Sequence, residues 1–217
     1  MGKYFILFLT FLISTPQSSG KKPRMLIIGD SISIGYFPFV RDALKDMAIV
    51  VHNKGNAQDT QHGLRKIKQW LGENRWDVIH FNWGLWDLCY RNPQSEEQGH
   101  RDKIHGTLTA TPEQYRRNLD SLVQILKQTK AKLIFAATTY VPDGEAGRFS
   151  DDVLKYNGIA AQLMRKYGIQ TDDLYTLSIA IHGKYGKAAN NVHYSAKGYA
   201  LLAKQVINRI EDALDEK

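Results

Sequence analysis

The stretch Met25-Leu26-Ile27-Ile28-Gly29-Asp30-Ser31 decides how the chain folds. Its four consecutive apolar residues, followed by a glycine, predict a short strand that is buried on both faces. The next segment with apolar residues at helical spacing is 39–47. Strands that alternate with helices pair in parallel. This stretch therefore predicts a parallel sheet, with a serine just after its first strand.

The same alternation continues to the end of the chain. Further strands are predicted at 48–52, 77–82, 132–138 and 169–173, and helices at 61–71, 112–129, 151–167 and 195–214. Helical connections between parallel strands place helices on both faces of the sheet. Binding sites on such sheets lie at the carboxyl ends of the strands, so the residues after each strand are the first candidates.

The composition is that of an ordinary folded protein. Of 217 residues, 43% are hydrophobic and 24% charged, which excludes collagen-like, low-complexity and disordered chains. Cys89 is the single cysteine and excludes both an internal disulfide and a cysteine zinc cluster. The formal charge of +7 permits an acidic partner, but no nucleic-acid-binding motif accompanies the basic residues. The chain therefore reads as one soluble domain that does not bind nucleic acid.

The first twenty residues are typical of a secretory signal peptide. Lys3 supplies a positive charge, residues 4–13 are apolar, and residues 14–20 are small or polar. A membrane-spanning helix needs roughly 20 apolar residues, so the apolar run is too short to span. We expect cleavage before Lys21, a single domain at 21–217, and an exported protein with no stable membrane insertion. The alternative is an uncleaved membrane anchor.

Two residues point to acyl transfer. Ser31 at a strand-to-helix turn can expose its hydroxyl in the field of the helix N-terminus, although Gly-Asp-Ser is also a common turn or helix cap. His193 lies in the loop Asn190-Asn191-Val192-His193 before the last helix and can supply a base. The sequence does not contain the G-x-S-x-G elbow of the α/β-hydrolases.

Four blocks resemble the SGNH hydrolases, also called GDSL-type esterases. They are G-D-S-I-S at 29–33, N-K-G at 53–55, D-V-I-H-F-N-W-G-L-W-D-L at 77–88, and N-N-V-H at 190–193. They occur in the family order, and the resemblance extends from residue 22 to the C-terminus. It implies a flavodoxin-like three-layer α/β/α sandwich with roughly five parallel strands. It also implies ester hydrolysis through an acyl-enzyme, with no cofactor and no metal.

By position, the resemblance implies Ser31 as the nucleophile and His193 as the general base. It makes the backbone N–H groups of Ser31 and Gly55 donors to the oxyanion, and a glycine lets the backbone approach the substrate closely. The family's third block supplies an Asn donor, but Trp86 occupies that position here. We assign the missing donor to Asn82 at the predicted strand end; the alternative is that Asn82 caps a turn.

The last block also departs from the family pattern, because Asn190 stands where the family has Asp. An amide oxygen can orient the imidazole of His193 but supplies no charge. Three possibilities remain open. Asn190 acts as the orienting residue, a carboxylate such as Asp172 or Asp173 substitutes for it, or the site is weak or inactive.

Two further residues are candidates for binding the substrate. We assign Trp86 and Asp30 to substrate binding, since an aromatic ring beside the site suits a sugar face. The loop 88–110 is long enough to suggest a function. The expected function is an exported serine esterase that hydrolyses an acetyl or other short-chain ester of a small molecule or glycan. The alternative is a non-catalytic or weakly active carbohydrate-binding protein on the same scaffold.

Overall fold

A five-stranded sheet forms the centre of the protein, whose computed structural model describes residues 21–215. The strands are β1 (Arg24–Ile28), β2 (Ile49–His52), β3 (Val78–Phe81), β6 (Lys132–Ala136) and β7 (Gln170–Asp172). Their spatial order is β2-β1-β3-β6-β7, and every neighbouring pair is parallel. The predicted parallel sheet is confirmed. The proposed signal peptide at 1–20 lies outside the described residues.

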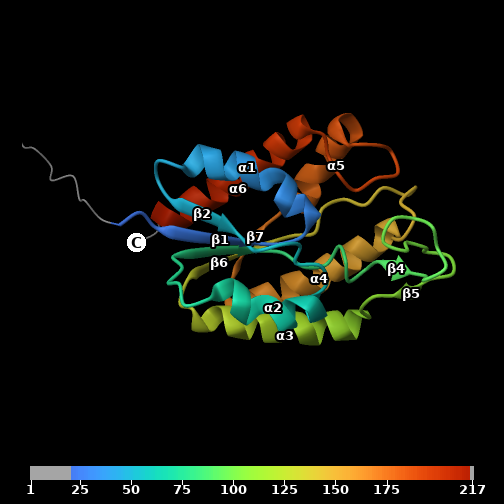
Figure 1. Ribbon diagram of the computed structural model, residues 1–217, viewed down its shortest axis with the longest axis horizontal. Coiled ribbons are helices and arrows are strands. Elements are labelled where there is room, and N and C mark those ends of the chain that lie inside the picture. The colour runs from blue at the N-terminus through green and yellow to red at the C-terminus, as the bar shows by residue number, and fades with distance from the viewer. Residues whose placement is uncertain (1–20, 216–217) are drawn as a thin grey trace, which may run out of the picture.

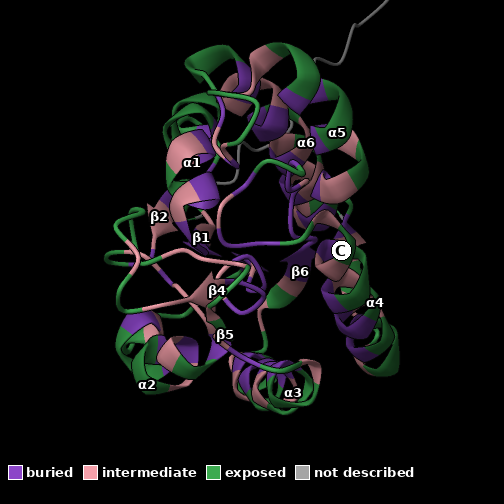
Figure 2. Cartoon of the chain, turned by 90° about the vertical axis from the view of Figure 1, so that its right-hand side faces the viewer, coloured by how far each residue is buried: buried purple, intermediate pink, exposed green. Residues whose placement is uncertain are grey.

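Six helices cover the two faces of this sheet. They are α1 (Ser31–Leu44), α2 (Thr60–Leu71), α3 (Pro112–Gln128), α4 (Ser150–Tyr167), α5 (Leu174–Tyr185) and α6 (Ala196–Asp215). Helices α1, α5 and α6 lie on one face and α2, α3 and α4 on the other (Figure 1). Figure 2 shows exposed residues on the outward surfaces of the helices and buried ones near the strands between them. The three-layer sandwich is therefore confirmed. Within residues 21–215, no helix is long and apolar enough to cross a membrane.

Helix α1 begins earlier than the sequence predicted. Its first residue is Ser31, and Pro38 lies inside it. The Asp30 side chain caps the helix by accepting the backbone N–H of Ile32 at 2.9 Å. A proline in a helix interior is unfavourable, and for this reason the sequence predicts helical spacing only after Pro38, at 39–47. The early start places the Ser31 hydroxyl in the first turn of a helix.

Helix α5 was not predicted. It starts after Asp173, whose carboxylate caps it through the backbone N–H and hydroxyl of Thr176. Its sequence, L-Y-T-L-S-I-A-I-H-G-K-Y, has apolar residues on all sides, so no helical period stands out. Its buried Leu174 and Ile181 belong to the main core, which explains how tertiary packing stabilises it.

The long segment after β3 is ordered by short strands. Within it, β4 (Tyr90–Arg91) pairs antiparallel with β5 (Thr107–Leu108), and both lie beyond one end of the main sheet (Figure 1). The backbone N–H of Tyr90 donates to the carbonyl of Gly147 at 2.7 Å, and that of Lys103 to Ala146 at 2.8 Å. These bonds fix the segment against the loop that precedes α4.

One polar pair crosses the core. His80 on β3 is buried, and its Nε2 lies 3.1 Å from Oδ2 of Asp172 on β7. The other carboxylate oxygen of Asp172 accepts from Gln205 of α6 at 2.6 Å. His80 is therefore a core residue with a polar partner on the edge strand. Both carboxylate oxygens of Asp172 therefore have partners inside the core.

Candidate functional site

The fold joins Ser31 and His193, which lie 162 positions apart in the sequence. The Oγ of Ser31 is 2.8 Å from Nε2 of His193. Both residues line a cavity of about 420 Å³ at the carboxyl end of the sheet. A hydroxyl at this distance can pass its proton to a neutral imidazole nitrogen. The structure therefore brings together the two residues predicted as nucleophile and base.

Asn191 is the residue that contacts the other side of the imidazole. Its Oδ1 lies 2.7 Å from His193 Nδ1 and also accepts the backbone N–H of His193 at 2.9 Å. This corrects the prediction, which gave that contact to Asn190. Asn190 is exposed, and its Cβ packs near Gly144. The residue spacing alone does not say which of two adjacent asparagines turns toward the ring.

No carboxylate within residues 21–215 makes a hydrogen bond to His193. Asp172 pairs with His80, and Asp173 caps α5, so neither of the suggested substitutes reaches the ring. With the Nδ1–H of His193 donated to the Asn191 amide oxygen, Nε2 is left as the acceptor for the Ser31 hydroxyl. The ring is thus oriented as a base without a neighbouring negative charge.

The surroundings of His193 favour its neutral form. Burial lowers the pKa of the imidazole below its usual value, and the positive charges of Arg148, Lys187 and Arg101 lower it further. Glu145 acts in the opposite direction, but its effect on the pKa is smaller than that of any of these groups. A neutral ring at neutral pH is the form that can accept a proton from Ser31.

Two backbone donors lie at this edge of the sheet. Neither the N–H of Ser31 nor that of Gly55 donates to another described residue. Gly55 has a φ of +78°, in the left-handed region that favours glycine. Buried Asn53 links the two segments, since its Oδ1 accepts the N–H of Gly29 at 2.9 Å and its Nδ2 donates to the Gly55 carbonyl at 3.0 Å.

Asn82 does not lie in the cavity wall. Its Nδ2 donates to the carbonyl of Ala136 at 2.7 Å and lies 3.4 Å from Oγ1 of Thr138. The amide joins the ends of β3 and β6 and already has two acceptors there, which favours a different donor for the oxyanion. Asn56 lines the cavity instead. Its Oδ1 accepts the backbone N–H of Gln58 at 2.8 Å, and its Nδ2 has no acceptor among the described residues.

The two residues assigned to substrate binding have different surroundings. Asp30 is buried and caps α1, and it lines a small neighbouring cavity rather than the one that contains Ser31 and His193. Burial raises the pKa of its carboxyl group. Trp86 does line the cavity. The guanidinium of Arg91 lies over its ring, 4.5 Å from the centroid, so one face of the indole is already covered.

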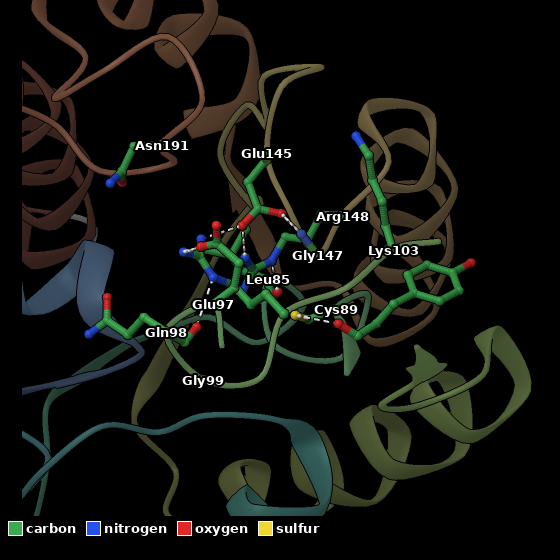
Figure 3. A network of polar contacts seen from close by, with 12 residues as sticks. Leu85, Cys89, Glu97, Gln98, Gly99, Lys103, Glu145, Gly147, Arg148 and Asn191 are labelled. Carbon is green, nitrogen blue, oxygen red and sulfur yellow. Dashed lines mark hydrogen bonds and ion pairs between the residues drawn. The ribbon is translucent and has the colours of Figure 1, made fainter. Parts of the chain in front are cut away.

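Arginines in the cavity wall were not foreseen from the sequence. Arg91, Arg101 and Arg148 all line the cavity, and Arg101 and Arg148 both bond to the buried carboxylate of Glu145. Figure 3 shows this carboxylate at the centre of the polar network. The length of the 88–110 segment was the one available signal, because two of the three arginines belong to it.

The fold and the sequence blocks that contain Ser31 and His193 place the chain in the class of SGNH hydrolases. The model of the GDSL-like lipase/acylhydrolase family matches residues 27–201, and the chain belongs to that family. Membership places it among the acylhydrolases, which cleave acyl esters.

Several solved structures share the fold. An acetyl xylan esterase, AlAXEase, is 15% identical with a TM-score of 0.69, covering 86% of this chain and 99% of its own. The lipase/acylhydrolase from Enterococcus faecalis is 18% identical with a TM-score of 0.68, covering 88% and 96%. Axe2, an acetylxylan esterase from Geobacillus stearothermophilus, is 17% identical with a TM-score of 0.69, covering 88% and 95%. No curated protein sequence matches the chain.

Proposed function

We propose that the protein is a serine esterase in which Ser31 is the nucleophile and His193 the general base. The observation that carries this proposal is the chain of contacts from Ser31 Oγ to His193 Nε2 and from His193 Nδ1 to Asn191 Oδ1, at 2.8 and 2.7 Å. The same two-step arrangement activates nucleophiles in unrelated serine hydrolases. Its position on a cavity wall gives a substrate access to the hydroxyl.

In the first half of the reaction, Ser31 Oγ bonds to the ester carbonyl carbon while its proton moves to His193 Nε2. The carbonyl oxygen becomes an oxyanion, to which the N–H groups of Ser31 and Gly55 and the Nδ2 of Asn56 donate. Each such donor contributes about 3–4 kcal/mol at the transition state. His193 then returns the proton to the departing alkoxide as the ester C–O bond breaks, leaving an acylated Ser31.

In the second half, His193 takes a proton from water as the water oxygen attacks the acyl carbon. The acid leaves and Ser31 recovers its proton. Every proton moves through His193, so no cofactor is required. Asn191 holds the ring orientation through both halves, and the imidazolium that forms in each has no carboxylate to stabilise it. We therefore infer a turnover rate below that of an enzyme with a complete triad.

The proposed substrate is an acetyl or other short-chain ester of a small molecule or glycan. Acetyl xylan esterases are among the proteins with the same fold, which supports this choice. Export follows from the proposed signal peptide at 1–20. N-terminal sequencing of secreted protein should start at Lys21; a sequence that starts at Met1 would contradict cleavage.

The direct test is hydrolysis of 4-nitrophenyl acetate by the native protein and by Ser31→Ala. We expect the variant to lose at least about a thousandfold in kcat, since only the oxyanion donors and binding would remain. Circular dichroism and thermal melting of the variant confirm that it is folded. Equal rates in the two proteins, or none in either, would favour the alternative of a non-catalytic carbohydrate-binding protein.

A further inference from the structure

The charge of the cavity is the feature that the proposed reaction does not use. Three arginines line it, Arg91, Arg101 and Arg148, and none of the described lining residues is acidic. Hydrolysis of a neutral ester needs no cation beyond the oxyanion donors. From this arrangement we propose that the natural substrate is an ester that also carries an anionic group, a carboxylate, sulfate or phosphate, bound by Arg91 and Arg148. The inference rests on the proposed esterase function and names its substrate class.

The buried part of the cluster has more positive than negative charge. Glu145 is fully buried, and its Oε1 accepts from Nη1 of Arg101 at 2.5 Å and from Nη1 of Arg148 at 2.9 Å. Its Oε2 is occupied by the backbone N–H of Gly147. One carboxylate therefore serves two guanidiniums. Glu97 lies 3.4 Å from Arg101 but is more than half exposed, so solvent weakens its effect.

Arg148 is held rigidly with donors to spare. Its side chain is only 6% exposed, its Nε donates to the Leu85 carbonyl at 2.6 Å, and its Nη1 donates to Glu145. No described residue accepts from its Nη2. Because the guanidinium cannot lose its charge, a free donor on this buried group favours an oxygen anion in the cavity.

Of the three arginines in the cavity wall, Arg91 is the one that makes no ion pair with a described residue. Its Nη1 donates to the carbonyl of Gly99, and its guanidinium stacks on Trp86. Both contacts fix the plane of the group without neutralising it. Trp86, the residue that replaces the family's usual Asn, thus positions a cation in the wall. A planar, oriented guanidinium suits two-point binding of a carboxylate, sulfate or phosphate.

The arrangement also fits the catalytic pair. Burial is the main reason that the pKa of His193 is low, and the positive charges of Arg148 and Arg101 lower it further. A substrate anion bound among them would offset part of that charge. Burial, the main cause of the lowered pKa, would still favour the neutral form of the ring that acts as the base.

The test compares matched esters that differ by one charge. Mono-4-nitrophenyl succinate and 4-nitrophenyl butyrate place or omit a carboxylate on the acyl half. The pair 4-acetoxybenzoate and methyl 4-acetoxybenzoate does the same on the alcohol half. Rates are divided by those of alkaline hydrolysis to remove intrinsic reactivity. In low salt we expect kcat/KM to favour the anionic member of at least one pair by about tenfold or more, chiefly through KM.

Arg91→Met tests the assigned cation, since Arg91 takes no part in the proposed chemistry. We expect it to abolish most of the anionic preference by raising KM for the anionic member of the pair much more than KM for the neutral member. Lys68→Met on α2 removes the same charge from an exposed position outside the cavity wall and should preserve the preference. A preference that is equal in the native protein and Arg91→Met, or absent from both ester pairs, would overturn the inference.

Binding measured without turnover separates this inference from the proposed function. Calorimetric titration of Ser31→Ala with 4-acetoxybenzoate should give a dissociation constant that weakens about tenfold when Arg91→Met is added. Binding of this kind together with no hydrolysis by the native protein would retain the anion site and reject the esterase. Hydrolysis of neutral esters with no anion binding would retain the esterase and reject the anion site.

Discussion

Asn191 contacts His193 at a position where serine hydrolases commonly have a carboxylate. Its amide oxygen lies 2.7 Å from Nδ1, close enough to fix the tautomer and the plane of the ring. A neutral acceptor cannot balance the charge of the imidazolium that forms in the transition state. The arrangement therefore provides orientation without electrostatic support, and a single substitution can add the missing charge.

Asn191→Asp should raise kcat for 4-nitrophenyl acetate by about tenfold or more at pH 8, because the carboxylate would stabilise the imidazolium. Asn190→Asp is the matched control. It adds the same charge one residue away at an exposed position that makes no hydrogen bond to the ring, so its kcat should change by less than about twofold. A larger gain in Asn190→Asp than in Asn191→Asp would return the orienting role to Asn190.

The pH dependence of the native enzyme should reflect the low pKa of His193. The base works only when neutral, so activity falls as pH decreases through that pKa. Burial and the nearby cations lower the pKa from 6.5, so the acidic limb of kcat/KM should have its midpoint below pH 6.5. Asn191→Asp should move this midpoint to higher pH, because a negative neighbour favours the imidazolium. A native midpoint above pH 7 would contradict the environment described for His193.

The two asparagines considered for the oxyanion hole can be separated by substitution. Asn56→Asp keeps the oxygen that accepts from Gln58 but removes the amide donor, and should lower kcat by about 10²–10³-fold with the fold intact. Asn82→Ala should leave kcat nearly unchanged and reduce stability by about 1–2 kcal/mol, through loss of its bond to Ala136. Steady-state kinetics and urea unfolding of both variants provide the comparison. The opposite pattern would restore Asn82 to the site.

At the scale of elements, close contact between α1 and α6 supports the catalytic pair. Ser31 starts α1, and His193 lies just before α6, so the packing of these helices sets their separation. Gly35 of α1 lies against the ring of Tyr199 on α6. A Cβ at that glycine would come within 2.2 Å of the ring. The absence of a side chain is what allows the two helices to approach.

Gly35→Ala should therefore destabilise the protein by about 1–3 kcal/mol, because the aromatic ring must shift. The same substitution at Gly158 is the control. Gly158 lies in α4 with no atom within 4 Å of the added Cβ, so Ala should stabilise the helix by about 0.5–1 kcal/mol. Urea unfolding of both variants measures the difference. Equal effects of the two substitutions would mean that the α1–α6 contact is looser than described.

At the scale of the whole molecule, a buried carboxyl group links stability to pH. Asp87 accepts the N–H and the hydroxyl of Thr60 through Oδ1, while its buried Oδ2 has no partner among the described residues. Burial, the main cause, raises its pKa to about 7. Since this exceeds the value of about 3.9 in an unfolded chain, the folded state keeps a proton that the unfolded state loses between these pH values.

The contribution of Asp87 to the free energy of unfolding should decrease as pH rises from about 4 to about 7, and then stay constant. Asp87→Asn removes this titration. The stability of the variant relative to the native protein should therefore be greater at pH 8 than at pH 4.5, by a difference on the order of 3 kcal/mol. Urea unfolding at the two pH values measures it. A difference that does not change with pH would show that Asp87 ionises freely in the folded protein.

The sequence by itself determined most of the strands and helices. Apolar runs such as 25–28 are buried wherever they lie in a parallel sheet, and the helical stripe of 112–129 requires one buried face, so both could be read from local pattern. Helix α5 could not be predicted from the sequence because it is apolar on all sides and is stabilised by tertiary contacts. Ser31 and His193 were found because each lies in a recognisable block after a strand or before a helix.

Only the tertiary structure decided how polar side chains are used. Asn190 and Asn191 are chemically identical, and the turn of the loop alone determines which one faces His193. Asn82 donates to a carbonyl of the neighbouring strand. Arg101 and Arg148 come from segments about 50 residues apart and meet at Glu145. The spacing of apolar residues in a strand or helix shows which of its faces is buried, and this spacing can be read from a short stretch of sequence. Hydrogen-bond partners depend instead on the directions of side chains in space, which a linear sequence does not contain.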